Sequence, residues 1–414
     1  MHLPGYYEFD CRVKIVSGRQ ALEKIPDLLY ALHAKAPQII TDQGVAGAGL
    51  LDTVIEALGE NIVIGAVVDD IPPDAPLPVV EKTAKIYREK GCDALIAVGG
   101  GSVIDTAKAV NILVSEESDN LKQFSGAGAL NRPLNPLIAI PTTAGTGSEV
   151  TLVAVVKDPE NHIKIPFVSP FLQPDIAIID PRMTLTLPAW VTAATAMDAL
   201  THAVEAYTCL ARNPISAAHA LAAIDLIHHH LLQVIRHPGD EIGRLALANA
   251  ATLAGMAFSN AMVGMVHSLG HSIGGVCGAA HGACMAILLP YSLAYNQHKN
   301  GHLIAELLLP LAGEDVFIGT PKHQRTQAVI KNINILNENL HDLTNGRHAR
   351  YLKEIFDADG NRLVPKEKLP EIARVSLGDA SRHYNPEEFD ELDAMRVLEA
   401  AWDGAAPDSC SLLT

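Results

Sequence analysis

Five residues between positions 198 and 281 have the types and spacing that could hold a metal ion. Asp198 and His202 are four positions apart, as are His267 and His271, and His281 follows ten residues after His271. Side chains four positions apart share one face of a helix. Two facing helices would therefore offer one carboxylate and two or three imidazoles to one divalent ion. Such mixed oxygen and nitrogen ligation suits Fe²⁺ or Zn²⁺ better than Mg²⁺ or Ca²⁺.

A single Asp-x-x-x-His pair is most often a surface or capping pair, so the surroundings decide the interpretation. These histidines lie among Ala, Gly, Leu and Met, where an unpaired polar group is costly to bury. We therefore expect a metal site. With Asp198, His202, His267 and His281 as ligands, His271 stays free for proton transfer, one helical turn beyond a ligand.

A glycine run is the second feature that could do chemistry. The apolar residues 94–98 lead directly into Gly99, Gly100, Gly101 and Ser102. A strand, a glycine turn and a helix starting near Ser102 would present free backbone N–H groups and a positive dipole end, which suits phosphate. The common G-x-G-x-x-G fingerprint would need glycine where Ile104 stands, and no Gly-Lys-Ser/Thr follows. Tight turns without a ligand also use glycines. Asp105 is expected to cap the helix or to contact the ligand.

A loop rich in hydroxyl groups follows the next apolar strand, 137–141. Thr142, Thr143, Thr146 and Ser148 would lie at the carboxyl edge of a parallel sheet, where open α/β sheets bind ligands. We expect them to hydrogen-bond a cofactor rather than to form an ordinary loop with side-chain turns. Residues 151–168 then read as a hairpin. Lys164 in this hairpin is expected to reach a pyrophosphate, although an isolated lysine is more often solvated.

The elements that must position these residues fall into two groups. Expected strands at 6–17, 37–42, 62–68, 94–98, 137–141 and 176–181 alternate with expected helices at 21–32, 46–58 and 79–90. This alternation predicts a parallel sheet covered on both faces. After Pro188 the pattern becomes helical and rich in Ala, Leu and His. A chain of 414 residues exceeds the usual single-domain size. We therefore expect an α/β domain over 1–187 and an all-helical domain over 188–414.

Composition excludes several classes of partner. The net charge of −16 argues against nucleic acid and anionic membranes. Six cysteines without paired spacing, and a start without a signal-peptide pattern, predict a cytoplasmic protein with reduced thiols. Residues 245–266 are uncharged and long enough to span a bilayer, but they contain polar side chains and lack flanking basic clusters. A buried helix is the favoured interpretation there.

Taken together, these motifs resemble the iron-containing alcohol dehydrogenase family, which is related to glycerol dehydrogenases and dehydroquinate synthases. Residues 99–108, 141–151, 197–202 and 267–290 carry the resemblance, in this order along the chain. It implies an N-terminal Rossmann-like parallel-sheet domain that binds a dinucleotide, followed by a C-terminal all-helical metal-binding domain. It also implies a homo-oligomer, a dimer or higher. Residues of about 340–370 look like extra or divergent sequence beyond the usual end of the family.

The resemblance also implies roles for individual residues. It implies that Asp198, His202, His267 and His281 are the metal ligands, and that His271 lies near the substrate. Cofactor-contacting positions are matched by Gly99, Gly100, Gly101, Ser102, Thr142, Thr143 and Lys164. Asp42 matches the acid that receives the adenosine ribose hydroxyls, which favours NAD over NADP.

The implied activity is reversible hydride transfer between a small primary alcohol or aldehyde and NAD(H), with Fe²⁺ or Zn²⁺ as the metal. Glycerol or diol oxidation is an alternative, but Val153 stands where some diol-active relatives carry a polar side chain. A non-redox lyase or cyclase of the dehydroquinate synthase type is another. It would need a basic cluster, whereas residues 198–281 contain only Arg212, Arg236 and Arg244 and no lysine. A non-catalytic nucleotide sensor would have no use for the spare His271.

Overall fold

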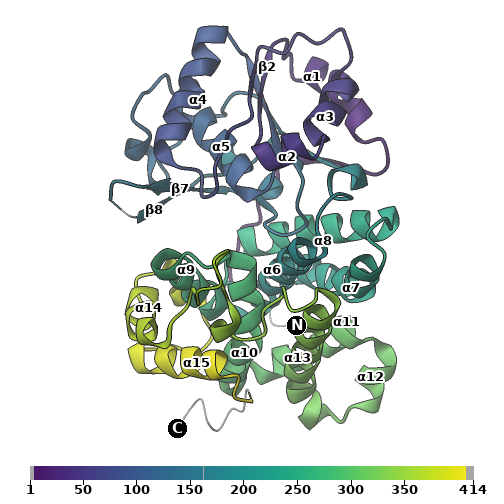
Figure 1. The fold of residues 1–414 in the computed structure, drawn as a ribbon, viewed down its shortest axis with the longest axis vertical. Coiled ribbons are helices and arrows are strands. Elements are labelled where there is room, and N and C mark those ends of the chain that lie inside the picture. The colour runs from purple at the N-terminus through teal and green to yellow at the C-terminus, as the bar shows by residue number, and fades with distance from the viewer. Residues whose placement is uncertain (1–3, 162, 407–414) are drawn as a thin grey trace. The chain divides into compact units, whose positions relative to one another are not determined.

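The structure is a computed structural model and describes residues 4–161 and 163–406. The chain forms two compact units. One unit is Asp10–Leu187. The other joins the residues before Asp10 to those from Pro188 onward. Figure 1 shows the helices and strands that make up each unit.

The first unit contains a sheet of six parallel strands, as the alternating pattern predicted. In spatial order the strands are β1 (Lys14–Ser17), β9 (Ile176–Ile179), β6 (Leu137–Pro141), β4 (Ala94–Gly99), β2 (Pro37–Ile40) and β3 (Ala66–Val68). The four inner strands are buried along their whole length, which explains why β4, β6 and β9 are unbroken apolar runs.

Helices cover both faces of this sheet (Figure 1). Alternate residues of β4 point to opposite faces: Ile96 packs with one set of helices, and Leu95 and Ala97 with the other. The first set is α1 (Ile25–Ala31), α2 (Gln43–Gly47) and α3 (Leu50–Leu58); the second is α4 (Leu77–Lys90) and α5 (Gly101–Ser115). The single helix expected over 46–58 is interrupted, because Gly49 adopts a left-handed φ of 76°.

A second, smaller sheet completes this unit. β7 (Val153–Asp158) and β8 (Ile163–Val168) form the predicted antiparallel hairpin. β5 (Gly126–Ala127) pairs with β8 in parallel, which the sequence pattern did not indicate. The short β5 has no alternating pattern from which it could be recognised.

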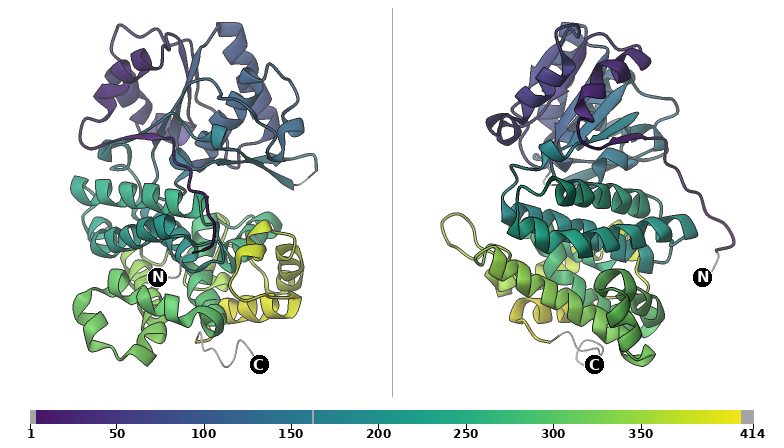
Figure 2. Two further views of the ribbon diagram at one scale, coloured as in Figure 1. Left: turned by 180° about the vertical axis from the view of Figure 1, so that it is seen from behind. Right: turned by 90° about the vertical axis from the view of Figure 1, so that its right-hand side faces the viewer.

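The second unit is helical, as predicted: all its named elements within the described residues are helices (Figure 2). They are α6 (Ala189–Thr208), α7 (Pro214–Arg236), α8 (Glu241–Ser259), α9 (Met265–Cys277), α10 (His281–Glu306), α11 (Leu308–Ala312), α12 (Glu314–Gly319), α13 (Arg325–Leu343), α14 (Leu369–Ser376) and α15 (Glu391–Asp403), with short 3₁₀ turns between them.

The uncharged stretch 245–266 is divided between two helices. α8 ends at Ser259 and α9 begins at Met265, with Met262 in a left-handed conformation between them. Within the described ranges, no helix combines the length and apolar character that crossing a bilayer requires.

Candidate metal centre and cofactor site

Three helices of the second unit bring four predicted residues together. Asp198 and His202 lie one turn apart on α6, His267 lies on α9, and His281 is the first residue of α10. One ligand atom from each of the four lies within 4.8 Å of the others. The structure thus gives the carboxylate and three imidazoles the convergence that the spacing predicted.

The donor set fits a divalent cation. Asp198, His202 and His267 are buried, and His281 is partly exposed. Asp198 Oδ1 lies 3.2 Å from His281 Nε2, a contact between two prospective ligand atoms, and within the described part of the chain no hydrogen bond reaches His267 Nε2. Buried polar atoms are rarely left in this state. A cation bound by these atoms would satisfy both, so the residues present suit the metal that the sequence predicts.

The protonation states also suit metal binding. Burial lowers the pKa of His202 to about 3 and that of His267 well below its ordinary value. Burial alone would raise the pKa of Asp198, but the facing imidazoles hold it well below the ordinary value. At neutral pH the two histidines are therefore neutral and the aspartate is ionised, which are the forms that bind metal.

A glutamate that the sequence interpretation missed stands behind His267. Glu205 Oε2 lies 2.5 Å from His267 Nδ1, and Glu205 Oε1 accepts a hydrogen bond from the Val266 amide at 2.8 Å. This contact directs His267 Nε2 toward the cluster. The signal was available in the sequence, because Glu205 lies three and seven positions after His202 and Asp198, on the same face of α6.

His271 sits one turn beyond His267 and has its own acidic partner. Its Nδ1 lies 2.9 Å from Asp379 Oδ2, and its ring stacks on His281 with centroids 5.4 Å apart. The His271 side chain is 44% exposed, so its other nitrogen has access to solvent. On the other side of the cluster, Phe258 stacks on His202 with centroids 4.1 Å apart. The sequence interpretation included neither Asp379 nor Phe258.

In the first unit, the glycine run and the threonine loop meet at the carboxyl edge of the sheet. Gly100 is the N-cap residue of α5 and provides no side-chain cap, and the Thr142 amide donates to the Gly99 carbonyl at 3.1 Å. A Cβ added at Gly101 would lie 2.9 Å from Thr146 Cγ2, and one added at Gly100 would lie 3.3 Å from Thr143 Oγ1. The glycines therefore let the loop pack closely against the start of α5, and the N-terminus of a helix favours an anion.

Asp42 follows its strand at the same edge. Ile40 pairs with Ala97 and Gly99 pairs with Pro141, so the residues after β2, β4 and β6 emerge side by side. The Asp42 side chain caps α2 by accepting a hydrogen bond from the Val45 amide at 2.9 Å.

Asp105 does not cap α5. Its buried carboxylate accepts hydrogen bonds from Ser148 Oγ at 2.6 Å and from the Val155 amide at 3.0 Å, and burial raises its pKa. It thus ties α5 to the threonine loop and to β7. The Ser148 hydroxyl donates its hydrogen in this contact.

Lys164 forms an ion pair, although its side chain is half-exposed. Its Nζ lies 2.9 Å from Asp74 Oδ1, and Lys157 Nζ lies 3.4 Å from Asp74 Oδ2. The sequence interpretation selected Lys164 and overlooked both Asp74 and Lys157. Asp74 precedes α4 by only a few residues, in a proline-rich loop that gave no sign of its position.

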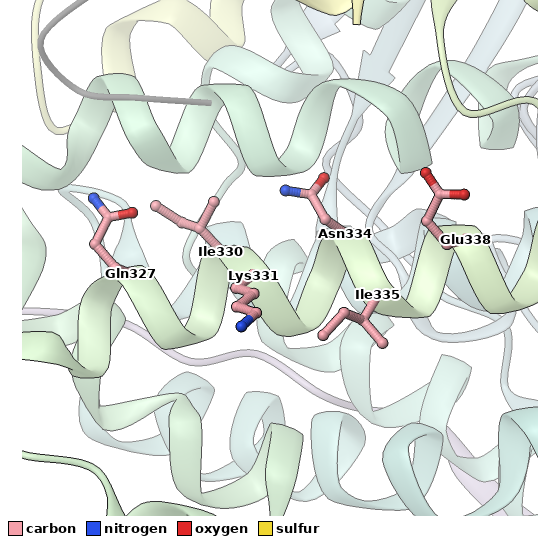
Figure 3. Close-up of a pocket in the computed structure, with 6 residues that line it drawn as sticks. All are labelled: Gln327, Ile330, Lys331, Asn334, Ile335 and Glu338. Carbon is pink, nitrogen blue, oxygen red and sulfur yellow. The ribbon is translucent and has the colours of Figure 1, made fainter. Parts of the chain in front are cut away.

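A groove of about 260 Å³ lies elsewhere in the second unit, along α13 (Figure 3). Its lining residues are Gln327, Ile330, Lys331, Asn334, Ile335 and Glu338. None of them belongs to the cluster, and Glu338 is paired with Arg350 at 3.2 Å. The groove offers no grouping of catalytic side chains.

Comparison with known proteins agrees with this arrangement. Residues 13–181 match the model of the iron-containing alcohol dehydrogenases, and residues 192–402 match the model of the C-terminal domain of that family. The second match runs through residues 340–370. The segment therefore lies within the family's usual length, and the part of the expectation that placed it beyond the family's end is wrong.

Individual relatives cover different parts of the chain. The NAD-dependent methanol dehydrogenase of Bacillus methanolicus is 36% identical over 61% of this chain and 66% of its own length. The aligned region thus spans just under two thirds of that relative. Two solved structures match over 96% of this chain and 100% of theirs, each at 30% identity. They are a 1,3-propanediol oxidoreductase with a TM-score of 0.89 and the alcohol dehydrogenase from Oenococcus oeni with a TM-score of 0.88.

The two family models together match most of the chain, and the fold matches that of a solved iron-containing alcohol dehydrogenase from Thermococcus thioreducens over 96% of the chain. The chain belongs to the iron-containing alcohol dehydrogenase family.

Proposed function

We propose that this chain is a metal-dependent alcohol dehydrogenase. It transfers a hydride reversibly between a small primary alcohol and NAD⁺, giving the aldehyde, NADH and one proton. The observation that carries the proposal is the convergence of Asp198, His202, His267 and His281 within 4.8 Å, with His267 Nε2 buried and without a hydrogen bond among the described residues. Fe²⁺ and Zn²⁺ both accept this ligand set.

The side chains around the cluster have separate tasks. A divalent ion held there would supply Lewis-acid chemistry, which lowers the pKa of an alcohol hydroxyl. His271 accepts the hydroxyl proton, directly or through water, and passes it to solvent. Asp379 holds the His271 ring by its Nδ1. Glu205 holds His267 in the same way, so that its Nε2 faces the ligand cluster.

The first unit supplies the cofactor site in this proposal. The amides at the start of α5 receive the pyrophosphate, and Thr142, Thr143 and Thr146 bind polar groups of the dinucleotide. Asp42 receives the adenosine ribose hydroxyls and repels a 2′-phosphate, so NAD is preferred over NADP. Lys164 adds positive charge beside the pyrophosphate.

A second candidate is a diol dehydrogenase. The structural match to a 1,3-propanediol oxidoreductase favours it. Val153 favours a simple alcohol, because an apolar side chain there offers a second hydroxyl no hydrogen bond. A non-redox lyase is less well supported. Arg244 is buried and donates to Thr192 Oγ1 at 2.7 Å, so it is not free to bind an acidic substrate.

Absorbance of reduced nicotinamide tests the proposal. The protein is incubated with NAD⁺ and a panel of C2–C6 primary alcohols, with 1,3-propanediol and glycerol included. We expect NADH to accumulate with simple alcohols and to be consumed again on addition of aldehydes. A lyase or a nucleotide sensor would give no redox change with any member of the panel. Elemental analysis of the same preparation identifies the metal, and light scattering tests the expected homo-oligomer.

A further inference from the structure

Asp74 lies at a point where three segments of the first unit meet. Its carboxylate contacts Lys164 Nζ at 2.9 Å and Lys157 Nζ at 3.4 Å, one lysine from each strand of the β7–β8 hairpin. Its backbone amide donates to Ser102 Oγ at 3.0 Å, in the first turn of α5. Asp74 therefore lies beside both Ser102, at the turn proposed to bind phosphate, and the two lysines of the hairpin.

The backbone holds Asp74 in this place. Asp74 and Ala75 both adopt left-handed conformations, with φ of 68° and 47°. Residues other than glycine rarely do so, and two in succession persist only when the surroundings fix them. Here the Lys157 amide contacts the carbonyls of Asp74 and Ala75, each at 3.2 Å, and Pro76 forms a β-bridge with Lys157. The loop is thus attached to the hairpin.

This position creates a conflict of charge. The proposed pyrophosphate site begins at the amides of α5, next to Ser102. A carboxylate beside that site repels the pyrophosphate and competes with it for the lysines. The side chains of Lys164 and Lys157 are 51% and 45% exposed, so both retain freedom to turn from one anion to another.

We propose that Asp74 is a displaceable counter-ion that sets how tightly the dinucleotide is held. In the free protein it pairs with Lys164 and Lys157. On binding, the lysines exchange Asp74 for phosphate oxygens, and on release they return to it. Each lysine contact with phosphate thus replaces an existing ion pair, so the net gain is smaller and the cofactor leaves faster. The inference rests on the proposed NAD site.

Asp74→Asn is the direct test. Asparagine tolerates the left-handed conformation and keeps the backbone amide, so the substitution removes the charge and little else. Exposed ion pairs contribute modestly, so we expect the Kd for NADH to fall about two- to five-fold. NADH dissociation, followed by stopped-flow fluorescence, should slow by a similar factor. Asp74→Gly, which also accepts this conformation, should tighten binding in the same direction.

Asp70→Asn is the matched control. It lies in the same loop and changes the net charge equally, but its carboxylate pairs with Lys82 at 2.8 Å instead of with the hairpin lysines. It should leave the Kd unchanged. Lys164→Ala should raise the Kd, and in that background Asp74→Asn should have a smaller effect than in the wild type.

The outcomes separate this inference from the proposed function. Wild-type protein that binds NADH, with Asp74→Asn and Asp74→Gly showing an unchanged or raised Kd, would overturn the counter-ion role and leave the dehydrogenase proposal standing. Wild-type protein that binds no NADH at millimolar concentration would overturn both.

Discussion

His267 Nδ1 and Glu205 Oε2 lie 2.5 Å apart in the interior of the second unit, and both side chains are buried. Glu205 also accepts a hydrogen bond from the amide of Val266, the residue before His267. One carboxylate therefore holds both the ring of a candidate ligand and the backbone that carries it. Partners of this kind fix which ring nitrogen faces a metal.

Glu205→Ala should weaken metal binding. Without the acceptor, the His267 ring loses its orientation, and metal affinity should fall about 10- to 100-fold. The measurement is a competition titration against a coloured chelator. Glu205→Gln is the control, because its amide oxygen still accepts from Nδ1–H and should retain more affinity than alanine. Wild-type affinity in the alanine variant would show that Glu205 does not position His267.

Asp42→Gly should relax the choice of cofactor. Removal of the carboxylate takes away the repulsion of a 2′-phosphate, so the kcat/KM for NADP should rise relative to that for NAD. Asp42 also caps α2, but glycine at this position costs only a few tenths of a kcal/mol. Asp240→Gly removes a comparable cap from α8 in the other unit and should leave the preference unchanged. If the ratio of kcat/KM for NAD to kcat/KM for NADP is unaltered in Asp42→Gly, Asp42 does not set the cofactor preference.

Gly101→Ala should impair NAD binding. The new methyl group would lie 2.9 Å from Thr146 Cγ2, so the threonine loop must move away from the start of α5. We expect the KM for NAD to rise and stability to fall by about 1–3 kcal/mol. Gly47→Ala is the control, because a methyl group there meets nothing within 4 Å. If both variants bind NAD equally well in titrations, close packing of the glycine run against the threonine loop is not required for NAD binding.

Asp379 should make stability depend on pH. Burial alone would raise its pKa, but hydrogen bonds from His271 and Ser381 lower the pKa to about 2, below the ordinary value of an aspartate. A carboxyl whose pKa is lower in the folded state stabilises the fold above the unfolded pKa and loses that effect as pH falls toward 2. The shift corresponds to about 2 kcal/mol.

Urea unfolding at pH 6 and pH 3 checks this contribution. Asp379→Asn should be less stable than the wild type at pH 6, and the difference should shrink at pH 3. Asp225→Asn serves as the control, because Asp225 faces the exposed His229 at 3.5 Å and should give little difference at either pH. An equal loss at both pH values would show that the charge of Asp379 is not what stabilises the fold.

The sequence contained most of the fold because its signals are local. The apolar run 94–98 followed by three glycines predicted β4, the turn and α5. The separation of four positions between Asp198 and His202 predicted that they share one face of a helix, which is α6. Contacts between distant segments have no such signal. Asp379 reaches His271 across 108 positions, and Asp74 reaches Lys164 across 90. Only tertiary packing brings these pairs together.

Metal content and turnover of His267→Ala show whether the four converging side chains hold the metal that the reaction needs. The variant removes one buried donor from the cluster, and His229→Ala, an exposed histidine on α7, is the matched control. We predict that His267→Ala loses bound Fe²⁺ or Zn²⁺ and NADH formation together, while His229→Ala retains both. Full turnover by metal-free His267→Ala protein would contradict the account.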